Sequence, residues 1–294
     1  MISLLLALTG AADAGAWTRG YGSYYAKIGA DLYTAPQYSS PATQLPGTDA
    51  SAAGPYFGQQ YGAYAELGLL DPDVWRIQLA VQAPLSVGRT TFRQESTFGD
   101  LAGYATVTRL GDVRITPQIA LHPTAPLAAG LEVKVPGYRN DSVCEDNPYR
   151  VYCARPGEGQ VDFTPYGAAG TPFARHGFVE GRLGWRWRTD AVIGSEAPTF
   201  PLGDGPVWSA TAGWTLGRLL ALAQADGVSV IGDDDVTPRA VRAGPAAMLT
   251  VHEPSGLALE ARFSADLWAK ATSRGYGGGV GVSMRSPGPR GDDE

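Results

Sequence analysis

Long apolar runs are missing from this sequence, and so is a strong excess of charge of either sign. Beyond residue 14 no apolar stretch approaches the roughly eighteen residues that a membrane-spanning helix needs. Charged residues make up 18% of the 294 residues, the formal net charge is −6, and the basic residues form no cluster. These absences exclude a helical membrane protein and argue against a nucleic-acid-binding protein. A β-barrel stays open, because its alternating strands average out in hydropathy scales, here to a mean hydropathy of −0.12.

Cysteine is scarce as well, with only Cys144 and Cys153, both in a polar stretch. Two cysteines this close together in an exported chain are typical of a disulfide within a loop. Zinc binding is the alternative, but no histidine lies nearby to complete a tetrahedral site. We therefore predict a disulfide between Cys144 and Cys153, and no metal site.

Histidine is nearly absent, and the three that occur lie in different segments without metal-ligand spacing: His122, His176 and His252. We expect His122 and His252 to form hydrogen bonds inside the folded chain. The serine-hydrolase motif G-x-S-x-G does not occur, and residues 271–275 come nearest to it but lack the first glycine. The run 233–235 of aspartates is more typical of a solvated loop than of a calcium site. The sequence therefore predicts neither an enzyme nor a cofactor.

The first fourteen residues have the pattern of a signal peptide. An apolar core at residues 2–8 is followed by Ala12 and Ala14, the small residues that a signal peptidase requires. No Lys or Arg precedes the core, and a buried first strand is the alternative interpretation. We expect residues 1–14 to be removed, residues 15–285 to form one domain, and residues 286–294 to be a disordered tail.

What the sequence has in plenty is alternation, most clearly in residues 178–188, FVEGRLGWRWR. One face of this segment carries Val179, Leu183, Trp185 and Trp187, while the other carries four charges. Full charges on one face and an aromatic pair closing the other are rare in soluble sandwiches. They are typical of a membrane β-strand, with lipid outside, a polar interior, and aromatic residues at the bilayer surface.

The same pattern recurs along most of the chain. The expected strands are residues 20–33, 55–69, 75–87, 112–122, 127–136, 160–169, 178–188, 207–218, 219–230, 241–252, 257–268 and 276–285. The connections between them tend to alternate between long and short, with long ones at 34–54, 88–111 and 137–160, the second of which has partial β character. We therefore predict an all-β fold, a transmembrane antiparallel up-and-down barrel of about twelve strands with long outer loops and short periplasmic turns. Both termini are then periplasmic.

The parity of the strands assigns side chains to the interior and to the rims. The predicted lumen or pore lining consists of Lys27, Asp31, Glu66, Arg76, Arg114, Glu132, Lys134, Glu180, Arg182, Arg186, Arg242, Glu260, Arg262 and Asp266, with Asp162 and Asp226 on the same parity. The predicted aromatic girdle consists of Tyr33, Trp75, Trp185, Trp187, Trp208 and Tyr276. The prolines Pro117, Pro165 and Pro245 predict bulges or locally opened pairing, and Trp268, on the lumen parity, needs a bulge or a rim position.

Interior charges of both signs have two interpretations. They can form a structural network that fills the barrel, or they can line a narrow polar path with a constriction for a solute. The residues alone favour neither interpretation over the other.

Four short segments together resemble the meta-pathway phenol-degradation family of outer-membrane transporters. They are residues 16–20 (AWTRG), 111–114 (GDVR), 131–137 (LEVKVPG) and 157–163 (GEGQVDF). The family usually has Pro-Thr-Gly where this chain has Pro136, Gly137 and Tyr138. The resemblance implies an outer-membrane barrel for the uptake of hydrophobic or aromatic compounds. Unlike the long-chain fatty-acid channels, this chain shows no N-terminal hatch of about forty residues before its first strand.

The sequence thus predicts a bacterial outer-membrane channel or uptake porin for small molecules, hydrophobic or aromatic ones included. The alternative is a non-conducting structural or surface-interaction barrel whose long loops bind partners. An outer-membrane hydrolase is a third hypothesis, and the parity map supplies no catalytic cluster for it. The expected partners are outer-membrane lipids and a small solute, and not nucleic acid.

Overall fold

The structure is a computed structural model, and it describes residues 16–39, 53–70, 76–94, 101–138, 157, 159–190, 201–231 and 237–286. The predicted signal peptide, the tail from 287 onward, Trp75, Cys144 and Cys153 lie outside the described residues. In the part of the chain that is described, no helix is long and apolar enough to cross a membrane. The fold there is built from strands.

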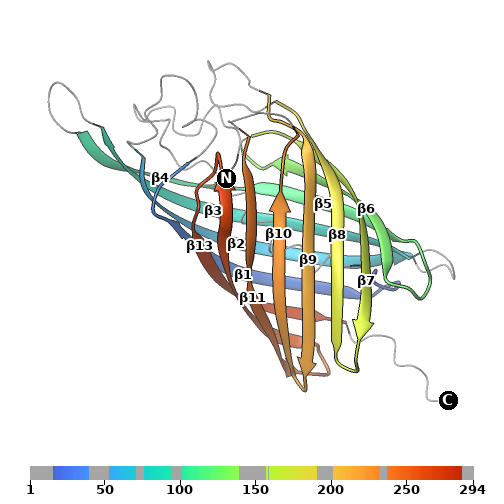
Figure 1. The fold of residues 1–294 in the computed structure, drawn as a ribbon. Helices are drawn as coiled ribbons and strands as arrows, with labels where there is room; N and C mark the ends of the chain where they lie inside the picture. Colours follow the sequence, from blue (N-terminus) through green and yellow to red (C-terminus); the bar gives the residue numbers. More distant parts are fainter. Residues whose placement is uncertain are drawn as a thin grey trace, which may run out of the picture.

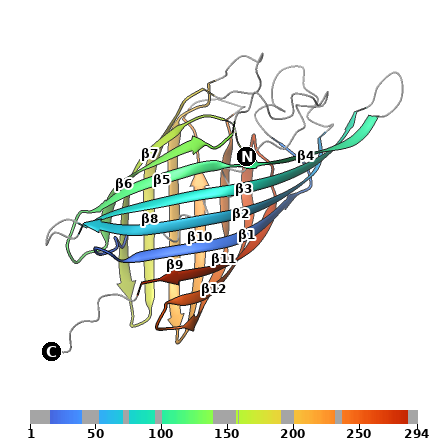
Figure 2. The ribbon, with the colours of Figure 1, turned by 180° about the vertical axis from the view of Figure 1, so that it is seen from behind.

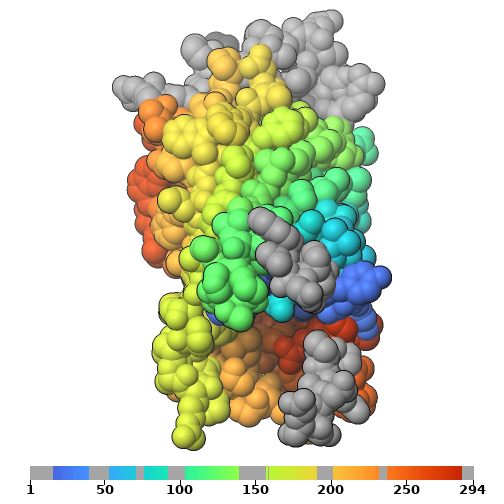
Figure 3. Space-filling model, turned by 90° about the vertical axis from the view of Figure 1, so that its right-hand side faces the viewer, coloured from blue at the N-terminus to red at the C-terminus, as the bar shows by residue number. Residues whose placement is uncertain are grey.

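Thirteen strands form one antiparallel sheet. They are β1 (Tyr24–Ala35), β2 (Ala53–Leu70), β3 (Ile77–Gln94), β4 (Leu101–Leu110), β5 (Asp112–Ala120), β6 (Leu127–Pro136), β7 (Asp162–Phe173), β8 (Gly177–Arg188), β9 (Gly205–Leu216), β10 (Leu219–Val228), β11 (Arg239–His252), β12 (Leu257–Lys270) and β13 (Tyr276–Arg285). Each strand pairs with its neighbour in the chain except at β4 and β5, where β3 pairs with both, and β1 also pairs with β13, for example Tyr25 with Arg285. The sheet is therefore a closed up-and-down barrel, elongated along its axis (Figures 1 and 3).

The ring of the barrel contains twelve strands, and β4 is an addition to it. The first half of β3 pairs with β5, and its second half, Leu85–Gln94, pairs with β4. Only Gly111 separates β4 from β5, and its N–H donates to the Pro84 carbonyl at 2.7 Å. The strands β3 and β4 consequently run on past the barrel as an extended ribbon (Figure 2). The predicted strand count is confirmed for the ring, and the β character of residues 101–110 is a full strand.

The two faces of the sheet are inverted relative to a soluble protein. Large apolar side chains point outward, as in Ile28 and Leu183, each 66% exposed. Charged side chains point inward, where Lys134 is 1% exposed and Glu66 is 2% exposed. Because successive residues of a strand face opposite sides, the alternation in the sequence produces this inversion directly. A lipid belt outside and a polar interior are what a membrane barrel requires.

The connections divide the barrel into two ends. The short connections at 121–126, 174–176, 217–218 and 253–256 lie at one end, called here the turn end, where β2 also ends and β3 begins. The strand ends that border the long connections 36–52, 137–161, 189–204 and 229–238 lie at the other, called here the loop end. The start of β1 and the end of β13 both lie at the turn end, since Tyr25 pairs with Arg285.

The irregular residues behave in two ways. At Pro117, Pro165 and Pro245 the pairing with one of the two neighbouring strands is interrupted. Two residues of each strand stay unpaired there, and the pairing then resumes in the same register. A proline lacks the N–H that the ladder needs, so opened pairing, and not a bulge, is the outcome at all three. Trp268 differs, because a register shift between Val241 and Arg242 inserts one residue opposite them. That bulge turns Trp268 outward, with 47% of its surface exposed.

Candidate functional site

The loop-end half of the interior holds a closed network of charges. Lys134 lies between Asp112 at 3.5 Å and Asp162 at 3.1 Å, and Arg186 reaches Asp162 at 4.0 Å. Asp112 and Asp162 are 0% and 3% exposed. Because a buried charge is costly unless it is paired, adjacent strands contribute opposite charges at this level. The side chains fill this part of the barrel.

A second group continues the network around the ring. Arg242 on β11 donates from Nε to Asp266 Oδ1 at 2.6 Å, and Tyr33 donates from its hydroxyl to Asp266 Oδ2 at 2.5 Å. The Arg242 guanidinium also lies over the Tyr33 ring at 5.2 Å. Asp226 on β10 faces the same region and is 5% exposed. Tyr33 was predicted in the aromatic girdle; at 3% exposed it is an interior residue, because it shares the parity of Lys27 and not that of its outward neighbours.

The middle of the interior is organised by Glu132. Its Oε1 accepts from Arg114 at 2.7 Å and its Oε2 from Arg182 at 3.1 Å. The Arg182 guanidinium lies over the Tyr166 ring at 3.6 Å, a cation–π contact. One carboxylate from β6 thereby joins arginines from β5 and β8, and Arg182 in turn contacts β7.

Residues 16–20, called here the N-terminal strap, lie inside the barrel and not along its wall. Arg19 pairs with Glu66 of β2, and its backbone N–H donates to Gln78 of β3 at 2.8 Å. Trp17 packs edge-on against Phe178 of β8 at 5.4 Å between ring centroids. Further contacts reach β5, where Gln118 donates to Thr18 at 3.3 Å, and β8, where Glu180 accepts from Ala16 N at 3.3 Å; Ala16 itself is 2% exposed. The strap therefore crosses the interior and joins opposite walls.

Between the strap and the charge network lies a cavity of about 200 Å³. One wall carries two ion pairs, Lys27 with Glu260 and Arg262 with Asp31, the latter with Nη2 and Nε at 2.5 and 2.8 Å from the carboxylate oxygens. Tyr25 donates to Glu260 Oε1 at 2.5 Å. The side chains of the two pairs are 10–15% exposed, whereas those of Arg242 and Asp266 are 2% and 0% exposed. The charges in the cavity are therefore open to its contents.

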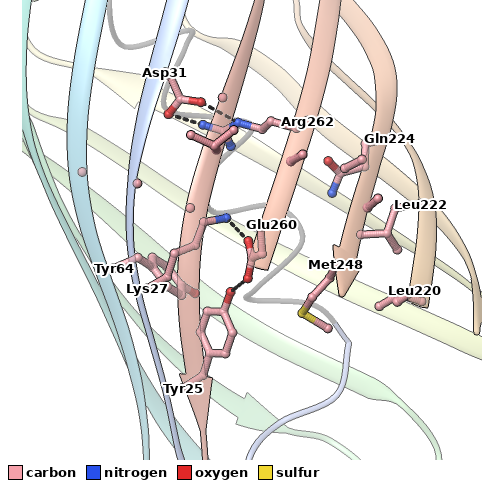
Figure 4. Close-up of a pocket in the computed structure, with 18 of the residues that line it drawn as sticks. Tyr25, Lys27, Asp31, Tyr64, Leu220, Leu222, Gln224, Met248, Glu260 and Arg262 are labelled. Carbon is pink, nitrogen blue, oxygen red and sulfur yellow. Dashed lines mark hydrogen bonds and ion pairs between the residues drawn. The ribbon is translucent and has the colours of Figure 1, made fainter. Parts of the chain in front are cut away.

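The opposite wall of the cavity is apolar. Leu220 and Leu222 of β10, Met248 of β11 and Phe178 of β8 line it. Figure 4 shows the leucines and Met248 on one side and the two ion pairs on the other. The space between them exists because several inward positions are glycines; at Gly62 an added Cβ would meet no atom within 4 Å. The result is a cavity with one charged side and one apolar side.

The structure brings most of the predicted interior residues together. Inward-facing positions are held by Lys27, Asp31, Glu66, Arg114, Glu132, Lys134, Glu180, Arg182, Arg186, Arg242, Glu260, Arg262 and Asp266. Arg76 departs from the prediction: it precedes β3 at the turn end and is exposed, because β3 begins one residue later. The histidines also depart from it. His122 is exposed in the connection between β5 and β6, where its Nδ1 accepts from Ala125 N at 2.9 Å, and His252 is exposed at the end of β11.

The outward aromatic residues gather near both ends of the barrel. Trp187 (50% exposed), Trp208 (37%) and Tyr276 (56%) lie toward the loop end, and Trp185 beside them is half-buried. Phe173 and Trp214 form a pair at the turn end, with ring centroids 5.6 Å apart. Aromatic side chains at these two levels are typical of the borders of a lipid belt.

Sequence reasoning missed the strap and the apolar wall. The inward position of Arg19 depends on contacts with β2 and β3, and the sequence around Arg19 contains no pattern that indicates such contacts. Leu220 and Leu222 share the parity of Asp226, but they alternate with Ala221 and Ala223, so both faces of β10 are apolar there and the pattern does not single out an apolar interior wall.

No family model and no curated protein matches the sequence. Among solved structures, the COG4313 outer membrane channel from Pseudomonas putida F1 matches with a TM-score of 0.63 at 12% identity, over 93% of this chain and 99% of that one. The Ralstonia pickettii toluene transporter TbuX matches at a TM-score of 0.45 and 9% identity, over 92% and 90% of the two chains. The translocator domain of the autotransporter NalP from Neisseria meningitidis matches at 0.45 and 12% identity, over 96% and 94%. The chain has the fold of a solved outer-membrane channel, and its membership of the meta-pathway family stays a prediction.

Proposed function

We propose that the protein is a channel in the outer membrane of a Gram-negative bacterium, serving the uptake of small molecules, hydrophobic or aromatic ones included. The observation that carries the proposal is the 200 Å³ cavity inside a closed barrel whose outer surface is apolar. A barrel built only as a scaffold has no need of an interior chamber with an apolar wall. In this proposal the turn end faces the periplasm, as short connections do in bacterial barrels.

A route through the barrel has to pass the middle of the bore. Arg182 projects there from β8, and Arg186 projects from the same strand into the adjoining loop-end half, where it is 8% exposed. Their carboxylate partners do not depend on them alone, because Glu132 keeps Arg114 at 2.7 Å and Asp162 keeps Lys134 at 3.1 Å. These two arginines can therefore be shortened without leaving a buried carboxylate unpaired.

The test is the conductance of single channels in planar lipid bilayers. Replacing both residues, Arg182→Ala with Arg186→Ala, is expected to raise the conductance at least roughly two-fold, because two of the longest side chains in the bore become methyl groups. Arg218→Ala is the control, since Arg218 lies in an exposed turn with Glu253 and its loss leaves the bore unchanged.

A second function is favoured by one observation, the closed network of charges in the loop-end half. If neither the wild-type protein nor the double variant conducts, and liposomes that contain them do not take up small solutes, the channel proposal is wrong. The barrel is then a non-conducting structural or surface-interaction protein.

A further inference from the structure

We propose that the cavity is a binding site for a small organic anion, a carboxylate with a compact apolar tail. The carboxylate lies between Arg262 and Gln224, and the tail lies against Leu222, Leu220 and Met248. The inference deepens the proposed function, on which it rests for placing the site along a transport route. It names a solute class that an apolar chamber alone would not select.

Arg262 has hydrogen-bond donors to spare. A guanidinium carries five N–H donors in a fixed plane. Asp31 accepts from Nε at 2.8 Å and from Nη2 at 2.5 Å, which uses one edge of the group. The Nη1 side is left for a second carboxylate, and its side chain is 13% exposed to the cavity. Asp31 thus holds the arginine in place and leaves it able to bind an anion, a geometry that suits bidentate recognition.

Gln224 supplies an independent observation. Its side chain lines the cavity, is 9% exposed, and its Nε2 has no hydrogen-bond partner among the described residues. Buried polar groups are rarely left without a partner, so a donor in this position needs an acceptor from outside the chain. Figure 4 shows the Gln224 side chain pointing into the interior on one side of Arg262, whose guanidinium is turned toward Asp31, and both residues line the cavity. An acceptor placed there satisfies both residues.

The charge around the cavity favours an anion. The lining contains four basic residues, Arg19, Lys27, Arg262 and Arg285, and two acidic ones, Asp31 and Glu260. Glu66 pairs with Arg19 from outside the lining, so the count is four basic against three acidic groups. The chain as a whole has a net charge of −6, so this local excess of positive charge opposes the general trend.

The remaining space is apolar and of limited size. Leu222 lies two residues closer to the turn end than Gln224 on β10, and Leu220 and its β11 partner Met248 lie four residues closer, so a tail that runs from the carboxylate toward the turn end meets them. An apolar cavity of about 150 Å³ holds one benzene molecule. The cavity of about 200 Å³ therefore accepts a small acid such as hexanoate and excludes long fatty acids.

The test compares hexanoate with hexan-1-ol and hexylamine, which share its tail and differ in the polar group. Binding to the full chain in detergent micelles is measured by isothermal titration calorimetry, with empty micelles subtracted. Hexanoate is expected to bind at least roughly ten-fold more tightly than either neutral or cationic probe, as hydrogen bonds to a charged acceptor predict. Equal binding of hexanoate and hexan-1-ol would show an apolar chamber without anion recognition and would overturn the proposal.

Two variants test the polar group. Gln224→Leu removes the free donor, and Asp31→Asn with Arg262→Gln removes the guanidinium without changing the net charge. Each is expected to weaken hexanoate binding roughly ten-fold and to leave hexan-1-ol binding unchanged. The matched control, Arg218→Gln with Glu253→Gln, removes an ion pair in exposed turns away from the cavity. Hexanoate binding that survives both test variants contradicts the assignment of these residues.

A third variant tests the place of binding. Gly62→Leu puts a side chain into the cavity, where an added Cβ meets nothing within 4 Å, and is expected to abolish binding of hexanoate. Gly167→Leu is the matched control, since an added Cβ there also meets nothing within 4 Å but Gly167 is exposed on the outer face of β7. Heat-modifiable gel migration shows that each variant is folded. Hexanoate binding without conductance would overturn the channel and keep the site, and conductance without hexanoate binding would do the reverse.

Discussion

At the scale of single residues, the interior charges differ in how far they are removed from water. The side chains of Lys134, Asp112 and Asp162 are 2%, 0% and 4% exposed, and those of Lys27 and Glu260 are 15% and 14% exposed. When a fully buried ion pair loses one partner, the other charge is left uncompensated. In a partly exposed pair, water screens part of the remaining charge. The residues near the loop end therefore contribute to stability, and those around the cavity remain available to a solute.

Lys134→Met is the most direct test of whether the buried charges near the loop end stabilise the barrel. It leaves Asp112 and Asp162 facing each other without the ammonium that lies 3.5 and 3.1 Å from them. The free energy of unfolding is expected to fall by about 3–5 kcal/mol, the usual result of breaking a buried pair. Urea unfolding in detergent or lipid vesicles, followed by heat-modifiable migration, measures it.

The matched control is Arg218→Met, which breaks an ion pair at 3.0 Å whose two side chains are both 64% exposed. Its effect is expected to stay below about 1 kcal/mol. Equal stability of the Lys134→Met and Arg218→Met variants would contradict the structural role given to Lys134.

At the scale of elements, the N-terminal strap is the part that the barrel holds by side chains alone. Arg19 is fixed by Glu66 and Gln78, and the exit from the strap is tight, since Gly22 N–H donates to the Gly68 carbonyl at 3.0 Å. An added Cβ at Gly68 would lie 1.9 Å from the Gly20 carbonyl oxygen, so only glycine allows this approach. The strap is consequently a packed element in spite of having no strand partner.

Glu66→Gln is expected to loosen the strap, because the carboxylate that pairs with Arg19 is replaced by a neutral amide. Trypsin should then cleave after Arg19 at least roughly ten-fold faster than in the wild-type protein, because cleavage follows local opening. Mass spectrometry of the protein in detergent measures the loss of the N-terminal segment. Glu253→Gln, in an exposed turn, serves as the control, and unchanged cleavage in Glu66→Gln would show that other contacts hold the strap.

At the scale of the whole molecule, the barrel presents an apolar outer surface bordered by aromatic residues. Leu183 lies at the middle of β8 and is 66% exposed, while Leu216 ends β9 at the turn end and is 58% exposed. These two leucines are alike in exposure and differ in their level along the axis. In a soluble protein their levels would have no meaning, and in a membrane they decide how deep each lies in lipid.

Leu183→Arg is therefore expected to lower the free energy of unfolding by about 2–4 kcal/mol in lipid vesicles, as a charge at the bilayer midplane does. Leu216→Arg is expected to lower it by less than about 1 kcal/mol, since it lies near the interface. Urea titrations of the two variants in the same vesicles measure the difference. Equal effects would contradict the position of the lipid belt, and ready solubility without detergent would contradict the belt itself.

The strand pattern was predictable because it depends on the period of two along each strand. The alternation of Val179, Leu183 and Trp187 with Glu180, Arg182 and Arg186 already assigns one face to lipid and one to the interior. The consequences of Pro165 and of Trp268 followed from the same local rule, as a missing N–H and an extra residue. For this reason the barrel, its approximate strand number and most of its inward charges could be derived from the sequence alone.

Only the tertiary structure decided what those inward residues do. Parity brings Lys134, Arg242 and Arg262 to the same interior, but closure of the ring sets which carboxylate each one meets and whether water reaches the pair. The cavity also depends on closure, because Gly62 of β2, Leu222 of β10 and Arg262 of β12 come from distant segments that the closed ring brings around one space. The strap is the extreme case, since Arg19 is held by Glu66 and Gln78, both remote from it in the chain. Local periodicity thus determined the wall of this barrel, and non-local packing determined its contents.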